Sequence, residues 1–242
     1  MNNMTRNSQN ELFRILDAPT YSISEASRLV GITRWRINRW LKGYEYTYYV
    51  GEETREGHQE SVVTRNDLPR KTYASFLDLI DLLFVKRFLE HGFSLQFIRM
   101  ALEEARERLG TPHFARDTFF LSGKHIILQM GTKSKFMVAL LTGGQGAMPE
   151  IIKQLGDKID FEEVTGFGFA SRWYPLGRDG MIVVDPQVSF GRPTILGRSI
   201  ATENIYDLYL GESKQIDFVS HWFEIPARET QAAVNYEASL VA

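Results

Sequence analysis

Apolar residues recur at spacings of three and four between positions 33 and 43 of the chain. Ile37, Trp40 and Leu41 would share one face of a helix with this period. Thr33 can cap the first turn of such a helix, and Gly43 follows its last turn. The pattern therefore predicts an amphipathic helix over residues 33–42.

A shorter helix is predicted just before this one, over residues 21–31. Ser24 can cap its free amides, and Gly31 can end it in a left-handed turn. The residues that precede it form a polar lead. Two short helices across a tight turn predict a helix-turn-helix.

The pattern changes to alternation after the second helix. Residues 46–50 and 61–64 predict two strands of a wing, joined by the polar and acidic segment 51–58. Residues 76–90 follow as a helix that is apolar on nearly every side. Such a helix must be covered on most of its surface, so we expect a homodimer. Residues 94–109 predict one more helix.

Short apolar runs dominate from residue 111 to residue 184, and they predict buried strands in a small α/β middle region. The tail then predicts three short helices, which span 202–210, 213–223 and a segment from Pro226 onward. The expected fold class is α+β, with domains over residues 1–110, 111–184 and 185–242. The first is a winged helix-turn-helix, and the last is a three-helix domain similar to a helix-turn-helix.

Composition excludes several classes of protein. The chain has no cysteine, so it has no disulfide framework and no zinc finger, and its five histidines lack metal-ligand spacing. We expect no metal and no cofactor. No run of about 18 apolar residues is present, so we expect a cytoplasmic protein with no membrane partner.

Charge is concentrated rather than abundant. The chain carries 28 Lys and Arg against 30 Asp and Glu, a net charge of −2. The segment 28–42 nevertheless holds five cations and no acid. Arginine can pair with guanine, asparagine with adenine, and both can hold phosphate. We therefore predict contacts with double-stranded DNA from Arg28, Arg34, Trp35, Arg36, Asn38, Arg39 and Lys42.

Two alternatives stand beside this prediction. A solvated cationic helix would show the same charges without binding DNA. Trp35 could equally pack against the wing or a neighbouring subunit.

The run from Tyr21 to Trp40, Tyr-Ser-Ile-Ser-Glu-Ala-Ser-Arg-Leu-Val-Gly-Ile-Thr-Arg-Trp-Arg-Ile-Asn-Arg-Trp, resembles the opening of the MerR family. The later Gly-Phe-Ser-Leu-Gln-Phe-Ile-Arg from residue 92 resembles the entry to that family's next helix. The resemblance covers about the first 110 residues. It implies phosphate and base contacts from Arg34, Arg36, Asn38 and Arg39. Trp35 departs from it, since that family usually has a small residue there.

The tail carries a second resemblance. Residues 184–202, Val-Asp-Pro-Gln-Val-Ser-Phe-Gly-Arg-Pro-Thr-Ile-Leu-Gly-Arg-Ser-Ile-Ala-Thr, are similar to a small prokaryotic domain family that occurs in antitoxins of VapB type. A MerR-like head with this tail resembles the long VapB-type antitoxins. The resemblance implies a PIN-domain ribonuclease toxin as partner.

Residues 185–242 hold four cations and eight acids, so this segment should repel DNA and contact protein. Arg192 and Arg198 could bind an anion beside Gly191 and Gly197, or could lie on an ordinary turn. The aromatic residues of the tail could be interface anchors or simply its core. The predicted partner or dimer contacts are Arg192, Arg198, Tyr206, Tyr209, Trp222, Phe223 and Tyr236.

No nucleophile with a base can be named from the sequence, so we expect no enzyme. Asp78 and Asp81 are paired carboxylates on an apolar helix, which we interpret as a helix edge or a subunit contact. The leading hypothesis is an antitoxin that represses its own operon and neutralises a PIN-domain ribonuclease. The alternatives are a MerR-type transcriptional regulator whose middle region binds a small molecule, and a nucleotide-handling enzyme with a DNA-binding head.

Overall fold

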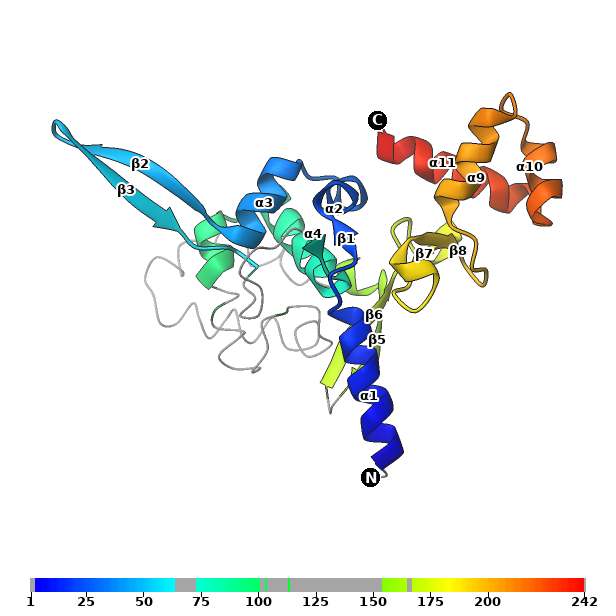
Figure 1. Cartoon of the computed structure of the whole chain (residues 1–242), viewed down its shortest axis with the longest axis horizontal. Helices are drawn as coiled ribbons and strands as arrows, with labels where there is room; N and C mark the ends of the chain where they lie inside the picture. The colour runs from blue at the N-terminus through cyan, green and yellow to red at the C-terminus, as the bar shows by residue number, and fades with distance from the viewer. Residues whose placement is uncertain are drawn as a thin grey trace. The chain divides into compact units, whose positions relative to one another are not determined.

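The computed structural model describes residues 3–63, 73–100, 154–164 and 167–241, together with Glu103 and His113 (Figure 1). The chain divides into two compact units. Unit 2 is the contiguous segment Tyr21–Ile152, and unit 1 combines Met1–Thr20 with Lys153–Ala242. Helices and small antiparallel sheets are both present, which confirms the α+β class. The predicted strands between residues 111 and 153 lie outside the described residues.

Unit 2 begins with the predicted pair of short helices. In chain order, its elements are β1 (Tyr21–Ser22), α2 (Ile23–Val30), α3 (Arg34–Lys42), β2 (Tyr44–Val50), β3 (Glu53–Gln59), β4 (Tyr73–Ala74) and α4 (Phe76–Glu90). A further helix begins at residue 95. β1 pairs with β4, which brings the start of α2 close to the start of α4. The Nζ of Lys86 on α4 donates to the carbonyl of Val30 at 2.8 Å, so α4 also holds the end of α2.

The core of unit 2 is built around α4. Eleven of its fifteen residues are buried, as expected for a helix that is apolar on nearly every side. This burial occurs within one chain, so α4 does not supply the exposed apolar surface from which we predicted a homodimer.

The aspartates of α4 are buried too, which corrects their interpretation as a helix edge. Asp78 completes a capping box with Ser75, whose backbone N–H donates to it at 2.9 Å. Asp81 and His113 lie 2.7 Å apart, and both side chains are buried. The two carboxylates have separate structural partners, because a buried charge requires compensation.

Unit 1 contains the four-stranded sheet and the last three helices. In chain order, its elements are α1 (Asn3–Leu16), β5 (Ile159–Val164), β6 (Phe167–Trp173), the 3-10 turn η1 (Arg178–Gly180), β7 (Ile182–Val184), the 3-10 turn η2 (Ser189–Gly191), β8 (Pro193–Ile195), α9 (Thr202–Gly211), α10 (Ile216–Phe223) and α11 (Ala227–Val241). The strands are antiparallel in the order β5-β6-β7-β8.

We predicted a domain boundary between residues 184 and 185. In the structure, β7 pairs with β8 across this position, so one sheet spans it. The segment that we predicted as a polar lead contains α1. The ring of Phe13 on α1 meets the ring of Phe169 on β6 edge-on, with 5.1 Å between the ring centres. α10 begins three residues later than predicted, because Ser213 and Lys214 adopt left-handed backbone angles.

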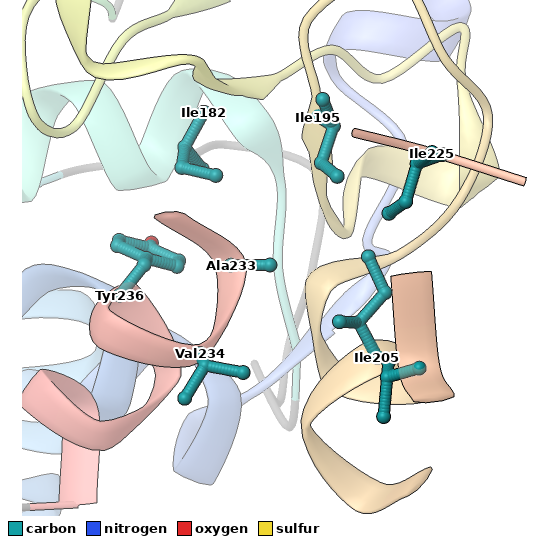
Figure 2. Close-up of a cluster of buried hydrophobic side chains, with 8 residues drawn as sticks. Ile182, Ile195, Ile205, Ile225, Ala233, Val234 and Tyr236 are labelled. Carbon is teal, nitrogen blue, oxygen red and sulfur yellow. The ribbon is translucent and has the colours of Figure 1, made fainter. Parts of the chain in front are cut away.

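A cluster of aliphatic side chains joins the end of the sheet to the three helices (Figure 2). Ile182 and Ile195 contribute from β7 and β8, and Ile205 points toward them from α9. α11 adds Ala233, Val234 and Tyr236. Tyr236 is 2% exposed, so its predicted role as a partner contact is wrong and it belongs to the core.

In the part of the chain that the structure describes, no helix is both long and apolar enough to span a membrane.

Candidate nucleic-acid interface

The turn between α2 and α3 is fixed at both ends by capping. Ser22 caps α2 through the backbone N–H of Glu25, and the Glu25 carboxylate accepts the N–H of Ser22 at 2.8 Å. This reciprocal box corrects the prediction of Ser24 as the cap. Gly31 ends α2 at φ 66°, as predicted. Thr33 then caps α3 by accepting from the N–H of Arg36.

α3 is buried on one face and open on the other. Ile37, Trp40 and Leu41 are buried, as their spacing predicts. Four of the predicted DNA contacts are exposed, while Arg28 on α2 and two more on α3 are half-buried. The exposed ones are Arg34, Trp35, Arg36 and Lys42, and the half-buried ones on α3 are Asn38 and Arg39.

Two of these side chains already have partners within the chain. The Nδ2 of Asn38 donates to the carbonyl of Arg34 at 3.1 Å, so one amide hydrogen is used inside the helix. The Arg34 guanidinium donates to the hydroxyl of Ser24 at 3.4 Å, which links the first turns of α2 and α3. Arg36 and Lys42 are exposed on the open face and make no such contact with the residues that the structure describes.

Arg39 does not point freely into solvent. Its guanidinium carbon lies 4.3 Å from the ring centre of Trp35 and 3.1 Å from that of Tyr44. It is therefore held between two aromatic rings, one on α3 and one on β2. Trp35 itself remains 63% exposed, and its contact with the wing runs through Arg39.

The wing is a hairpin of seven residue pairs that extends from the end of α3 (Figure 1). Its second strand is the segment 53–59, which we predicted as the polar connection between strands. The turn of the hairpin lies at the beginning of that segment, at Gly51, whose φ is 64°. The predicted strand 61–64 instead returns to α3, where the N–H groups of Val62 and Val63 donate to the carbonyl of Trp40.

A ladder of tyrosines lines one face of this hairpin. The rings of Tyr44, Tyr46 and Tyr48 follow one another at 6.0 Å intervals. Gly57 lies opposite Tyr46, and a Cβ there would come within 2.6 Å of the Tyr46 ring. The tyrosine ladder, as we call Tyr44, Tyr46 and Tyr48, was not among the predicted site residues. Its sequence signal is the alternation of tyrosines at every second position.

Acidic residues occupy the opposite face. Side chains of directly paired residues lie on the same side of a sheet, so Glu45 with His58 and Thr47 with Glu56 face away from the ladder. The Nδ1 of His58 lies 2.5 Å from the Glu45 carboxylate, and this hydrogen bond raises the pKa of His58. The face that continues from Arg39 is thus mainly aromatic. Glu45 and Glu56 lie behind it, whereas Glu53 lies on the ladder side and is paired with Arg55 at 3.1 Å.

The tail residues predicted as partner contacts fall into two groups. Trp222 is 66% exposed and stacks on Phe218, 6.3 Å away on α10. Tyr206, Tyr209 and Phe223 are half-buried against the aliphatic cluster. Phe218 was not predicted, although its position one helical turn before Trp222 was a signal for it.

The arginines of the tail have local partners. The Nε of Arg192 donates to the carbonyl of Ser189 at 3.4 Å, and the Nε of Arg198 lies 2.5 Å from the Glu229 carboxylate. Glu237 is buried and accepts the Thr202 hydroxyl at 2.5 Å. Glu229 and Glu237, two of the eight acids of this segment, therefore have partners inside the unit, and the acidity of its surface is smaller than the sequence suggests.

Among the described residues, no group of three metal-ligating side chains could hold a metal ion. The chemistry of the interface is that of planar cations, an amide and aromatic rings, which suits bases and phosphates rather than a metal-dependent reaction.

Comparison with known proteins gives this surface a context. A Mycobacterium tuberculosis protein named "Putative antitoxin VapB45" is 22% identical over 206 residues, which cover 81% of this chain and 84% of that protein. The chain has antitoxin and regulator relatives. Three proteins from M. tuberculosis and M. bovis, each named "Uncharacterized HTH-type transcriptional regulator", are 40% identical over 126 residues. The match covers 52% of this chain and spans about half of their length, 49%.

The fold is shared with a solved structure. The crystal structure of Rv2018 from M. tuberculosis matches 90% of this chain and 99% of its own, with a TM-score of 0.66 and 18% identity. No family model matches the sequence.

Proposed function

We propose that the protein is a DNA-binding antitoxin that represses its own operon and neutralises a PIN-domain ribonuclease. The observation that carries the DNA-binding part is the open face of α3, where Arg36 and Lys42 stand free of acids and Arg39 is held in place by Trp35. The names of the relatives support the two halves of the proposal separately.

In this proposal, unit 2 acts as a MerR-like winged helix-turn-helix. α3 enters the major groove, and Arg34, Arg36 and Asn38 reach base edges and phosphates from its first turns. The tyrosine ladder lies along the adjacent backbone, where phenol hydroxyls donate to phosphate oxygens. The acids behind the ladder then face away from the phosphates.

Unit 1 contacts the nuclease in this proposal. The stacked pair Phe218 and Trp222 gives α10 an exposed aromatic surface, and Asp217 and Glu224 lie beside it in the sequence. Aromatic anchors surrounded by acids suit the basic surface of an RNA-cleaving enzyme. The protein would bind an inverted-repeat operator as a homodimer, since each half-site needs one α3.

A second candidate is a MerR-type transcriptional regulator with a small molecule as effector. The higher identity to the HTH-type regulators favours it, over about half of the chain. Its effector would bind in the middle region, much of which lies outside the described residues. A nuclease gene beside this one, and a nuclease that binds the protein, would decide for the antitoxin.

The DNA-binding half is tested by titrating the full chain against the DNA upstream of its own gene at fixed salt. Arg36→Ala should weaken binding by about 1 to 3 kcal/mol if Arg36 pairs with a base. Arg228→Ala removes an exposed cation from unit 1 and is the matched control, with no expected change. Equal affinity of Arg36→Ala and wild type would overturn the assignment of α3.

The antitoxin half is tested by mixing the protein with the nuclease encoded next to it. Wild type should form a stable complex and suppress RNA cleavage. Trp222→Ala should weaken the complex while leaving DNA affinity intact, because the two surfaces lie in different units. A Trp222→Ala variant that silences the nuclease as well as wild type would remove α10 from the interface.

A further inference from the structure

The loop between β7 and β8 in unit 1 is tightly held. The N–H of Val188 donates to the carbonyl of Asp185 at 2.9 Å, and the N–H of Gly191 donates to that of Val188 at 3.0 Å. The Ser189 hydroxyl reaches across to the carbonyl of Ser199 at 2.6 Å. These bonds fix the loop against the segment that follows β8.

This loop stores backbone strain at a bulky residue. Ser189 and Phe190 adopt φ values of 49° and 57°, so two consecutive residues with side chains occupy the left-handed region. A phenylalanine there is unfavourable, and such strain persists where function retains it. Its effect here is to hold the Phe190 ring in solvent, 82% exposed.

A groove of about 370 Å³ opens beside this ring. Val183, Thr194 and the Asp185 carboxylate that holds Arg172 are its buried lining residues, and Val188 and Leu196 add more exposed apolar surface. Phe190 lies two residues beyond Val188, and its neighbour Ser189 is bonded to Ser199, another lining residue. Phe190 therefore belongs to the loop that borders the groove and is not among its lining residues.

Two guanidinium groups complete the groove. Arg172 is fixed by the Asp185 carboxylate, 2.7 Å from its Nε, and Arg198 is fixed by Glu229. Planar cations and aliphatic side chains together suit an aromatic ring, because the ring face attracts cations and its body prefers apolar contact. A cavity of about 150 Å³ already holds benzene, so the groove has room for a phenyl ring.

We propose that Phe190 of one copy inserts into this groove of a second copy. The ring and the groove arise from the same segment, residues 183–199, with Arg172 beside them. A patch that carries both parts is complementary to itself, and two copies related by a two-fold axis would exchange their rings reciprocally. The inference rests on the proposed function only in taking the protein to be a homodimer. It places the dimer contact at this patch, whereas from the sequence we based the dimer on α4.

The test measures the mass of the full chain by light scattering over a series of micromolar concentrations. Phe190→Asn removes the ring but keeps the backbone, because asparagine tolerates left-handed angles. Leu196→Trp keeps the ring and fills the groove. Each variant should raise the dimer dissociation constant about tenfold or more, as expected for an aromatic anchor at an interface. Tyr49→Ala is the control, since it removes an aromatic side chain of similar exposure, 76%, from β2 in the other unit.

Mixing the two variants gives a sharper result. A hybrid pair retains one intact insertion, the Phe190 ring of the Leu196→Trp chain in the open groove of the Phe190→Asn chain. The mixture should therefore dimerise more tightly than either variant alone. Circular dichroism of each variant shows whether it remains folded.

The remaining outcomes separate this inference from the proposed function. A Phe190→Asn protein that dimerises like wild type would overturn the ring-in-groove contact and leave the homodimer standing. A wild type that is monomeric throughout would overturn both. A Phe190→Asn protein that keeps its dimer but loses the nuclease would assign the groove to the nuclease instead.

Discussion

Arg39 shows how a single side chain can be prepared for binding before any ligand arrives. Its position between Trp35 and Tyr44 removes most of its rotational freedom. The guanidinium loses less entropy on contacting DNA than a free arginine would lose, and its planar edge is already oriented. We therefore propose that Trp35 contributes by positioning Arg39 rather than by contacting bases itself.

This role gives a prediction at Trp35. Trp35→Ala should weaken DNA binding by about 1 kcal/mol, because Arg39 loses one of its two rings. The effect should vanish when Arg39 is already alanine, which a double-mutant cycle measures. If the two substitutions act additively, Trp35 touches DNA by itself and does not work through Arg39.

At the scale of residues, spacing in the sequence predicted which side chains of α3 are buried. It did not predict how the others are held. A helical wheel places Arg39 on the outer face, yet its position depends on Tyr44, five residues later and on a different element. The cap of α2 was misplaced by two residues for a similar reason, since Ser22 is selected by its pairing with Glu25.

The hairpin β2-β3 shows that a strand can form where the sequence pattern does not predict one. Glu53 to Gln59 contain six polar or charged residues and one glycine, so alternation gives no strand signal there. The strand forms because its backbone pairs with β2 and because Gly57 leaves room for the Tyr46 ring. α4 is the opposite case, where continuous apolar character predicted the burial correctly but not that it occurs within one chain.

The acidic face of the hairpin yields a prediction about pH. The hydrogen bond to Glu45 raises the pKa of His58, with further support from the charges of Glu45 and Glu60. The protonated histidine therefore stabilises the hairpin at low pH, and this contribution disappears as pH rises through the folded-state pKa. Glu45→Gln should lower the pKa of His58 in a titration followed by nuclear magnetic resonance. A constant His58 pKa would show that the pair does not form in solution.

The sheet of unit 1 gives the opposite dependence on pH. Burial opposes ionisation of Asp160, but hydrogen bonds from Tyr174 and Arg178, each 2.7 Å long, outweigh it and lower the pKa of Asp160. The ionised carboxylate therefore stabilises unit 1 above the ordinary pKa of aspartate, and this contribution is lost as pH falls through the lowered value.

Removing the phenol hydroxyl tests this contribution. Tyr174→Phe should lower the free energy of unfolding by about 1 kcal/mol at neutral pH, and the difference should shrink as pH falls from the ordinary pKa of aspartate through the lowered pKa of Asp160. Urea unfolding at neutral and acidic pH measures it. A difference that stays constant over this range would mean that the hydroxyl acts through packing alone.

At the scale of the whole molecule, the distribution of charge sets how salt acts on binding. The net charge is −2, so attraction to phosphate requires a local cationic patch, which we propose to be the α3 face, and does not arise from the protein as a whole. Arg34→Ala should reduce the slope of log affinity against log salt concentration by about 1 if Arg34 contacts a phosphate. An unchanged slope would mean that Arg34 does not contact a DNA phosphate and acts only through its hydrogen bond to Ser24.

The two units also differ in how their residues are distributed along the sequence. Unit 2 is one contiguous segment, whereas unit 1 joins the first 20 residues to the last 90. During synthesis, the N-terminal segment emerges first but must wait for β5 and β6 before Phe13 finds its partner Phe169. The unit with the cationic helix can be complete while the unit with the ring and the groove is still unfinished at the ribosome. A nascent chain thus acquires its two surfaces in a fixed order, and one that stops early keeps only the first.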